Sequence, residues 1–372
     1  MIKRTLLLLS SLLCMMPAVA QSWHERHAIP WHTVGDYCGP AFCDVSEPLE
    51  HTLSCREDGD CLLMELSVKN PTEEHVDIKE GMASVRLGIN TSMEDPKVYF
   101  NQFFPTMLRC EKTHLWGYFE APDGRVLAIC SPDAVASWHN DYAELGHRIH
   151  TVTLDLMQPL PLPQRHPQTL HKLAPHQQLT WRVWLIPLSS VSEVPEAVAK
   201  KCGVPIIDIE RTTLAIGETS ELTVYSPQAT PILKIISPTG AVDLKKLKKN
   251  GDGRYTMEWT APSEAGYYHV TIQAGEKQSE ATVFVRRPWS WYLQQADREA
   301  SLMEQKAMQH REGWMGFFTE YWAQVYFPDT VRLAAIERDF QRFYKEMVDP
   351  RTGFFYTNKK TWHTRPQNTS WM

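Results

Sequence analysis

The sequence predicts two successive β-sandwiches followed by an α-helical segment. Short alternating strands, separated by proline, aspartate and glycine, fill most of residues 21–286, and helical periodicity takes over after Arg287-Pro288. A chain of 372 residues exceeds one ordinary domain, and a hydrophobic fraction of 43% can fill several cores. We therefore expect one β-sandwich over residues 21–203, a second over 204–286 and helices over 287–372.

The N-terminus has the pattern of a secretory signal peptide. Lys3 and Arg4 form a positive start, Leu6–Met16 is an apolar stretch too short to span a bilayer, and Ala18-Val19-Ala20 is a small-residue cleavage site. We expect residues 1–20 to be removed and the mature protein to be exported, either to the periplasm or out of the cell. No later segment is long and apolar enough for a transmembrane helix, so no membrane insertion is expected after signal removal.

Charge and motifs exclude several classes of function. The net charge of −6 gives no electrostatic reason to expect nucleic acid as a partner. The sequence contains no G-x-S-x-G elbow, no Gly-rich phosphate loop and no dinucleotide fingerprint. Serine-hydrolase and nucleotide-dependent chemistry are therefore disfavoured, and we expect no cofactor.

Export makes the cysteines candidates for disulfides. Cys55 and Cys61 flank a turn and can face each other across a hairpin, and Cys110 and Cys130 flank a second hairpin-like unit. The sequence leaves the connectivity open, and buried free thiols are the alternative. Cys38-x4-Cys43 is not a usual zinc spacing and no histidine pair follows it, so no metal site is expected.

The first sandwich is predicted from many short strands divided by turn residues. Pro159–Pro167 is expected to be a loop or an extended edge, because proline cannot donate to an interior ladder. A short helix is expected at Val194–Lys201, before Gly203. The predicted strands are Leu62–Val68, Val76–Ile78, Ala83–Ile89, Leu115–Phe119, Arg125–Ile129, His150–Leu156 and Thr180–Ile186.

The second sandwich has the size and strand spacing of an immunoglobulin-like module. Gly253–Ile272 resembles the late strands of bacterial immunoglobulin-like domains, although the Cys-Trp-Cys pattern of antibody domains is missing. We expect a spacer or brace with no chemistry of its own. The predicted strands are Ile206–Ile209, Ser220–Tyr225, Ile232–Ile236, Tyr255–Trp259, Gly266–Gln273 and Ala281–Val285.

The helical segment is predicted from apolar stripes at helical spacing. A first helix begins at Trp289, a second carries the aromatic stripe from Trp314 to Val325, and a third begins after Pro328 with Asp329 as its N-cap. The second stripe is aromatic enough to require more neighbours than two helices provide.

The order of β-sandwich, immunoglobulin-like module and aromatic helical hairpins resembles bacterial six-hairpin glycosidases, whose catalytic part is an (α/α)6 toroid. His310–Trp322, Gly353–Tyr356 and Trp362–Trp371 resemble the first hairpins and a rim loop of such a toroid. The resemblance implies that residues 287–372 begin a toroid that this chain, apparently truncated, leaves incomplete. In such enzymes the catalytic acids usually lie further along the toroid, so the resemblance assigns none here.

The loop from Thr361 to Trp371 has the composition of a sugar-binding surface. Sugar sites combine aromatic platforms with polar donors and acceptors, and an arginine suits a uronate because its fork pairs with a carboxylate. The alternative is that the tryptophans pack into the core and the arginine caps a carbonyl. The candidate binding residues are Trp314, Trp362, His363, Arg365, Asn368 and Trp371.

Glu312 is a weak candidate for a catalytic acid or base, near the junction of the first two helices. Glycoside hydrolysis normally needs a second carboxylate, and Glu320 lies about 12 Å further along the helix, which is too far for a retaining pair. A helix N-terminal charge is the alternative role for Glu312. No catalytic residue is therefore established.

Trp138 and His139 belong to the densest polar and aromatic cluster of the first sandwich, which we expect to be a loop. They are candidates for a loop that lines a substrate cleft, and ordinary loop packing is the alternative. A metal site formed with Asp141 and His147 lacks the regular spacing that such sites show.

These observations together predict an exported carbohydrate-active protein with a poly- or oligosaccharide as its partner. The first hypothesis is a glycoside hydrolase acting on a polysaccharide that can contain uronate, with a catalytic part that is incomplete in this chain. The first alternative is a non-catalytic glycan-binding or structural module. The second is a polysaccharide lyase, for which Tyr321 or His363 could supply the base.

Overall fold

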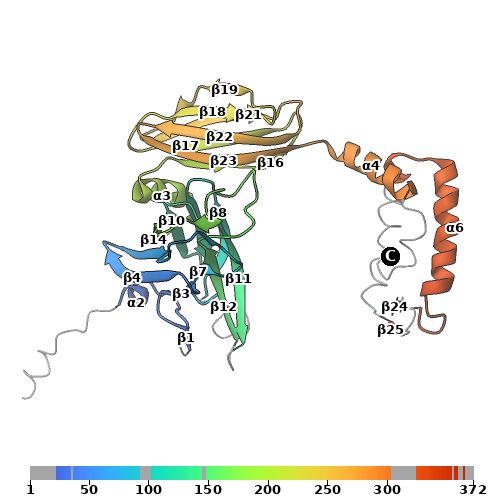
Figure 1. Cartoon of the computed structure of the whole chain (residues 1–372). Helices are drawn as coiled ribbons and strands as arrows, with labels where there is room; N and C mark the ends of the chain where they lie inside the picture. The colour runs from blue at the N-terminus through green and yellow to red at the C-terminus, as the bar shows by residue number, and fades with distance from the viewer. Residues whose placement is uncertain are drawn as a thin grey trace, which may run out of the picture. The chain divides into compact units, whose positions relative to one another are not determined.

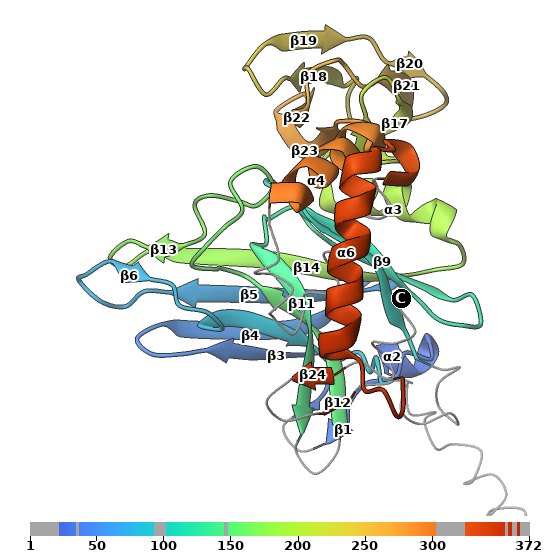
Figure 2. The same ribbon diagram turned by 90° about the vertical axis from the view of Figure 1, so that its right-hand side faces the viewer.

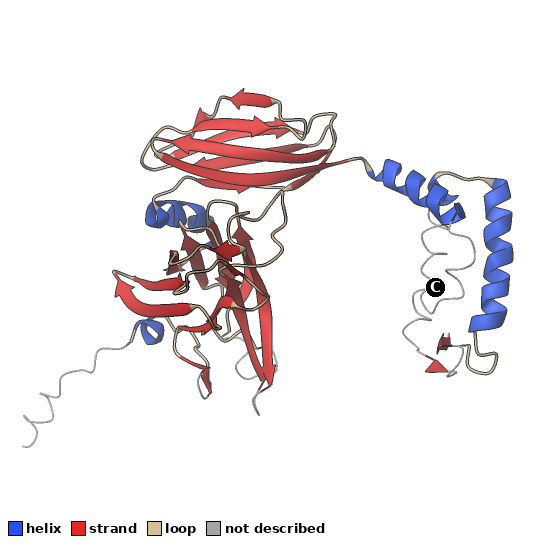
Figure 3. Ribbon diagram, in the orientation of Figure 1, coloured by secondary structure: helices blue, strands red, loops and turns tan. Residues whose placement is uncertain are grey.

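The computed structural model describes residues 22–34, 37–92, 102–144, 148–302, 324–353, 356–358 and 363–364. They fall into two compact units. The first contains both β-sandwiches (Met1–Leu214, Thr219–Thr260 and Gly266–Phe284), and the second contains the helical segment (Ala215–Glu218, Ala261–Ala265 and Val285–Met372). Figure 3 shows strands throughout the sandwiches and helices in the C-terminal segment. No helix among the described residues has the length and apolar character needed to cross a membrane.

The N-terminal sandwich consists of two antiparallel sheets (Figures 1 and 2). In spatial order, the six-stranded sheet contains β4 (Glu50–Asp58), β5 (Cys61–Lys69), β14 (Gln178–Leu188), β10 (Val126–Ser131), β9 (Leu115–Glu120) and β8 (Phe104–Cys110). The four-stranded sheet contains β11 (Ser137–Glu144), β12 (Arg148–Asp155), β7 (Ala83–Leu87) and β3 (Ala41–Val45). The short elements are α2 (Trp23–Arg26), β1 (Thr33–Val34), β2 (Tyr37–Cys38), β6 (Val76–Asp77) and β13 (Lys172–Leu173).

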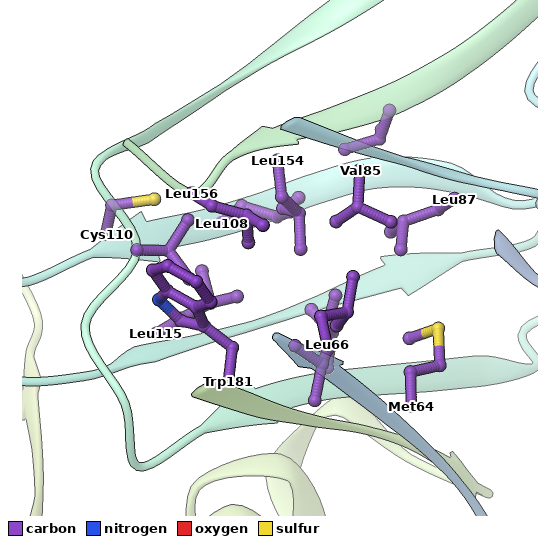
Figure 4. Packing of buried hydrophobic residues seen from close by; sticks show 14 of the residues in the cluster. Met64, Leu66, Val85, Leu87, Leu108, Cys110, Leu115, Leu154, Leu156 and Trp181 are labelled. Carbon is purple, nitrogen blue, oxygen red and sulfur yellow. The ribbon is translucent and has the colours of Figure 1, made fainter. Parts of the chain in front are cut away.

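The core between these sheets follows from the alternation of side chains along each strand. In β5 the residues Leu62, Met64, Leu66 and Val68 all face this core, because successive side chains of a strand point to opposite faces. Figure 4 shows this packing, with Leu66, Leu154 and Trp181 converging from different strands. All seven strands predicted for this sandwich are present, and β1, β2, β3, β4, β8, β11 and β13 were not predicted as strands.

The opposite face of the six-stranded sheet is also buried. Leu63, Trp116 and Ala128 pack there with residues of α3 (Val194–Cys202), which follows the 3-10 turn η2 (Val191–Glu193). Gly203 ends α3 in the left-handed conformation, with φ 66°, which glycine adopts without strain. The short helix predicted before Gly203 is therefore confirmed, and it covers a second core.

The second sandwich also has two sheets, and its six predicted strands are all present. Trp259 and Tyr268 meet edge to face with ring centroids 5.3 Å apart, and both are buried. One sheet contains β15 (Ile206–Ile209), β17 (Thr219–Tyr225), β21 (Arg254–Thr260) and β20 (Lys248–Lys249). The other contains β16 (Thr213–Ala215), β23 (Lys277–Arg286), β22 (Gly266–Ala274), β18 (Ile232–Ile236) and β19 (Val242–Lys245).

The second unit contains two helices that the sequence predicted, α4 (Trp289–Leu302) and α6 (Thr330–Met347). The carboxylate of Asp329 caps α6 as predicted, because it accepts hydrogen bonds from the backbone N–H of Val331 at 2.9 Å and of Arg332 at 3.0 Å. Most of the predicted second helix lies outside the described residues. The (α/α)6 toroid is not shown by the described part of the chain and stays a prediction.

The register of the sheets excludes both disulfides that the sequence suggested. Cys55 lies opposite Met64, which faces the core between the sheets, whereas Cys61 packs on the α3 side. Cys110 and Cys130 are likewise buried on opposite faces of the same sheet. The described cysteine thiols are all free, and Cys130 hydrogen-bonds to Cys202 of α3.

The backbone of β8 passes very close to Gly117 of β9. A Cβ at this position would overlap the carbonyl oxygen of Met107 and lie 2.8 Å from the Cα of Leu108, so the backbone would have to move. We expect Gly117→Ala to lower the free energy of unfolding by about 3 kcal/mol or more, as measured by urea denaturation.

Gly124→Ala is the matched control for this substitution. Gly124 has φ 88° but nothing within 4 Å of an added Cβ, so only backbone strain of about 1 kcal/mol is expected. Equal losses in the two variants would contradict the close approach of β8 to β9.

Candidate functional site

An open, polar pocket of about 470 Å³ lies on the outward face of the four-stranded sheet. We call it the polar pocket. Six of its eight lining residues carry a hydrogen-bonding or charged side chain, and none is phenylalanine, tyrosine or tryptophan. It is lined by Asp44, Val45, Ser46, Gly81, Ser84, Arg86, His139 and Thr153.

Strand register brings the polar residues of this pocket together. His139 of β11 lies opposite Thr153 of β12, and Thr153 lies opposite Arg86 of β7. In β7 and β12 the neighbours Val85 and Leu154 face the core instead. Side chains alternate between the two faces along a strand. The apolar residues are therefore buried on the inner face of this sheet, and the polar residues lie together on its outer face.

Ion pairs and hydrogen bonds hold the side chains of the polar pocket in place. Arg86 Nε donates to Asp44 Oδ2 at 2.5 Å, and His139 Nδ1 lies 3.1 Å from Asp155 Oδ2. Asp155 also accepts a hydrogen bond from Ser137 Oγ at 2.7 Å, so its carboxylate is held from two sides. The arrangement provides fixed donors and acceptors for a polar ligand.

Thr153 lies at the centre of this network without a partner for its hydroxyl. Its side chain is only 2% exposed, and its Oγ1 makes no hydrogen bond with any described residue. A buried polar group without a partner is unusual in folded proteins, because it loses its hydrogen bonds to water. A hydroxyl-bearing ligand or a water molecule would satisfy it.

The structure separates the two residues that the sequence predicted for this region. The segment expected to be a loop is in fact the strand β11, so adjacent residues point to opposite faces. His139 lines the polar pocket, whereas Trp138 packs against the core and donates from its indole N–H to the carbonyl of Leu108 at 3.1 Å. Substrate binding by either residue stays a prediction.

The other predicted site residues lie wholly or partly outside the described part of the chain. His363 is in β25 (His363–Thr364), which pairs with β24 (Tyr356–Asn358), and its side chain is not described. His147 is outside the described residues, and in the described part no group of three or more His, Cys, Asp and Glu side chains could hold a metal. The remaining candidates, Glu312, Trp314, Trp362, Arg365, Asn368 and Trp371, lie outside the described residues and stay predictions.

A charged cluster that the sequence analysis missed joins the two sandwiches within the first unit. Glu280 Oε1 lies 2.9 Å from Lys112 Nζ and 3.1 Å from His269 Nδ1, and all three side chains are partly buried. The backbone N–H of Glu280 donates to Thr113 Oγ1 at 3.1 Å. Burial and the nearby Lys112 lower the pKa of His269, against the opposing effect of Glu280. No local pattern could reveal this cluster, because its partners are far apart in the sequence.

His114 lies at the end of the same β8–β9 turn and is buried. Its Nδ1 lies 2.9 Å from Thr113 Oγ1, and its Nε2 has no partner among the described residues. Burial, together with the charge of Arg109, lowers the pKa of His114 to about 3. The imidazole is therefore neutral at physiological pH.

Comparison with known proteins gives a likeness of fold. No protein-family model and no curated protein matches the chain. A solved polysaccharide lyase matches 88% of this chain with 11% sequence identity and a TM-score of 0.58. The match covers 52% of the lyase, so this chain spans about half its length. At this identity the likeness shows the fold alone.

Two further solved structures match less of the chain. A thermostable endoglucanase mutant from Alicyclobacillus acidocaldarius covers 28% of this chain and 17% of its own, with 21% identity and a TM-score of 0.19. The tandem immunoglobulin repeats of Dlar cover 48% of this chain and 91% of their own, with 13% identity and a TM-score of 0.17. Neither supports a conclusion about this chain, and membership of the six-hairpin glycosidases stays a prediction.

The buried His114 predicts that acid destabilises the first unit. The pKa of His114 is lower in the folded protein than in the unfolded chain, so the unfolded chain binds a proton at higher pH. The free energy of unfolding therefore has its full value above the unfolded pKa of about 6.5 and decreases as the pH falls towards about 3. In urea denaturation, the free energy of unfolding should fall by up to about 1.4 kcal/mol per pH unit in this range.

Burial also lowers the pKa of His32, so part of this slope should remain when His114 is replaced. His114→Gln should show a smaller slope than the wild type, and His51→Gln, at an exposed position of β4, is the control for the same exchange at the surface. An unchanged slope in His114→Gln would show that His114 is not the titrating group.

Proposed function

We propose that this chain is part of an exported carbohydrate-active protein that acts on a polysaccharide. The observation that carries the proposal is the likeness of fold to a polysaccharide lyase over 88% of the chain. That protein's name states its substrate class, and we extend the class to this chain as a hypothesis. The signal-peptide pattern of residues 1–20 supports export.

The polar pocket supplies groups that suit a glycan. Sugars present dense hydroxyls, which need both donors and acceptors at fixed positions. Arg86 and His139 provide N–H groups, Asp44 provides carboxylate oxygens, and Thr153 and Ser84 provide hydroxyls. These groups project from paired strands, which hold them more rigidly than loops would. Because no phenylalanine, tyrosine or tryptophan lines the pocket, hydrogen bonding supplies the recognition in this proposal.

The chemical step of the whole protein belongs, in this proposal, to the helical part. The first hypothesis remains a glycoside hydrolase, in which paired carboxylates cleave the glycosidic bond. The likeness to a polysaccharide lyase favours β-elimination as the second candidate. The two reactions differ in their products, because elimination leaves an unsaturated sugar that absorbs ultraviolet light, whereas hydrolysis leaves only a new reducing end. A protein that binds glycan without releasing either product would be a non-catalytic module.

Binding at the polar pocket is tested by Arg86→Ala and His139→Ala. Each substitution removes hydrogen bonds from a polar ligand, so the dissociation constant for a bound glycan should rise about tenfold or more. The measurement is affinity electrophoresis of the purified full chain against neutral and acidic polysaccharides, followed by calorimetry with any that bind.

Arg56→Ala is the control, because Arg56 also forms an arginine–carboxylate ion pair, with Glu65 at 3.2 Å, away from the polar pocket. It should bind like the wild type. The proposal fails if the wild type binds no glycan, and the polar pocket is excluded if all variants bind equally well. In the same assay, Trp362→Ala and Arg365→Ala test the predicted loop of the helical part.

A further inference from the structure

A second pocket, of about 300 Å³, lies where the two sandwiches of the first unit meet. We call it the seam pocket. The N-terminal sandwich contributes Arg109 and Glu111 from the β8–β9 region and Gln164 and Arg165 from the Pro-rich loop. The second sandwich contributes Tyr267 and Phe284. Its volume lies at the lower end of the range for small-ligand sites, about 300–1,000 Å³.

Two aromatic rings form one wall of the seam pocket. Tyr267 of β22 and Phe284 of β23 have ring centroids 4.9 Å apart, with their planes inclined at 42°. Tyr267 is 42% exposed, whereas the next residue, Tyr268, points into the core of the sandwich. The sheet therefore holds an exposed aromatic surface on which the apolar face of a ligand ring can pack.

The Pro-rich loop is attached to this aromatic wall. Thr282 of β23 lines the pocket and donates from its hydroxyl to the carbonyl oxygen of Gln164 at 2.9 Å. Arg165, the next residue along the loop, also lines the pocket. The segment Pro159–Pro167, which the sequence predicts as a loop or an extended edge, thus contributes part of the pocket lining.

The charged residues of the seam pocket leave an excess of positive charge. Arg109 Nε donates to Glu111 Oε1 at 2.8 Å, and these two side chains are only 7% and 3% exposed. The Arg109 guanidinium also lies 5.6 Å from the ring centroid of Trp116, so Arg109 is fixed in place. Arg165 is exposed and forms no ion pair with the described residues. Its guanidinium can therefore pair with an anionic group of a ligand.

We propose that the seam pocket binds an anionic sugar ring of the polysaccharide, separately from the polar pocket and from the helical part. The Arg165 guanidinium pairs with the carboxylate or sulfate group, and Tyr267 and Phe284 pack against the apolar face of the ring. Gln164 and Thr282 provide further polar atoms at the rim. This inference rests on the proposed function, because it identifies which sugars the first unit recognises.

The test is calorimetry of the full chain with three probes. They are an oligogalacturonate, a sulfated oligosaccharide and a neutral galacto-oligosaccharide of the same length. The wild type should bind at least one anionic probe more tightly than the neutral one. Arg165→Ala should weaken that binding about tenfold or more and leave binding of the neutral probe unchanged. Tyr267→Ala should weaken binding of both kinds of probe, because the aromatic packing does not depend on charge.

The controls separate failure of this inference from failure of the proposed function. Arg165 and Tyr267 are exposed, and each variant should unfold at the wild-type urea concentration, which confirms the fold. If anionic binding survives in both variants but is lost in Arg86→Ala, the seam pocket is excluded and the proposed function stands. If inorganic sulfate alone competes as well as the oligosaccharide, the pocket recognises an anion and not a sugar. If the wild type binds no probe and no polysaccharide, both proposals fail.

Discussion

Burial of the six-stranded sheet on both faces is the constraint on which the rest of the first unit depends. Every residue of β10 is buried, with Leu127 and Ile129 on the side of the four-stranded sheet and Ala128 and Cys130 on the side of α3. A strand covered on both sides is expected to be a nearly continuous apolar run, and in β10 only the last residue, Ser131, is polar. The sheet is consequently the fixed layer against which the four-stranded sheet and α3 pack.

The two pockets are consequences of this layer. The four-stranded sheet packs its inner face against the six-stranded sheet. Its outer face carries the polar pocket. At one edge of the layer, the turn between β8 and β9 carries Lys112 to Glu280 of the second sandwich. The seam pocket forms beside this contact, and its geometry depends on the same turn.

The polysaccharide-binding role that we propose would use both pockets. Each is small relative to a polymer, and each offers a different chemistry: hydrogen-bonding groups in one, and an aromatic wall with an arginine in the other. Two sites on one compact unit can bind the same polysaccharide molecule at once, which raises the overall affinity without strengthening either contact.

The sequence by itself determined where most regular elements lie. Alternation located Leu62–Val68, which is β5 (Cys61–Lys69), and the cap at Asp329 located the start of α6. These features were predictable because a period of two residues, a period of 3.6 residues and a capping side chain are all local properties. His139 could be singled out because the density of polar and aromatic residues around it is also a local property of the sequence.

Only the tertiary structure decided which faces and which distant residues meet. It placed Cys55 and Cys61 on opposite sides of one sheet. The segment with Trp138 and His139, which we expected to be a loop, is a strand, so the two side chains point to opposite faces. It also paired Lys112 with Glu280 in an ion pair and placed Arg165 and Tyr267 in the lining of one pocket. The physical reason is that a shift of one residue in register moves every side chain of a strand to the other face. Register depends on pairing between segments that are far apart in the chain, so no local pattern records it.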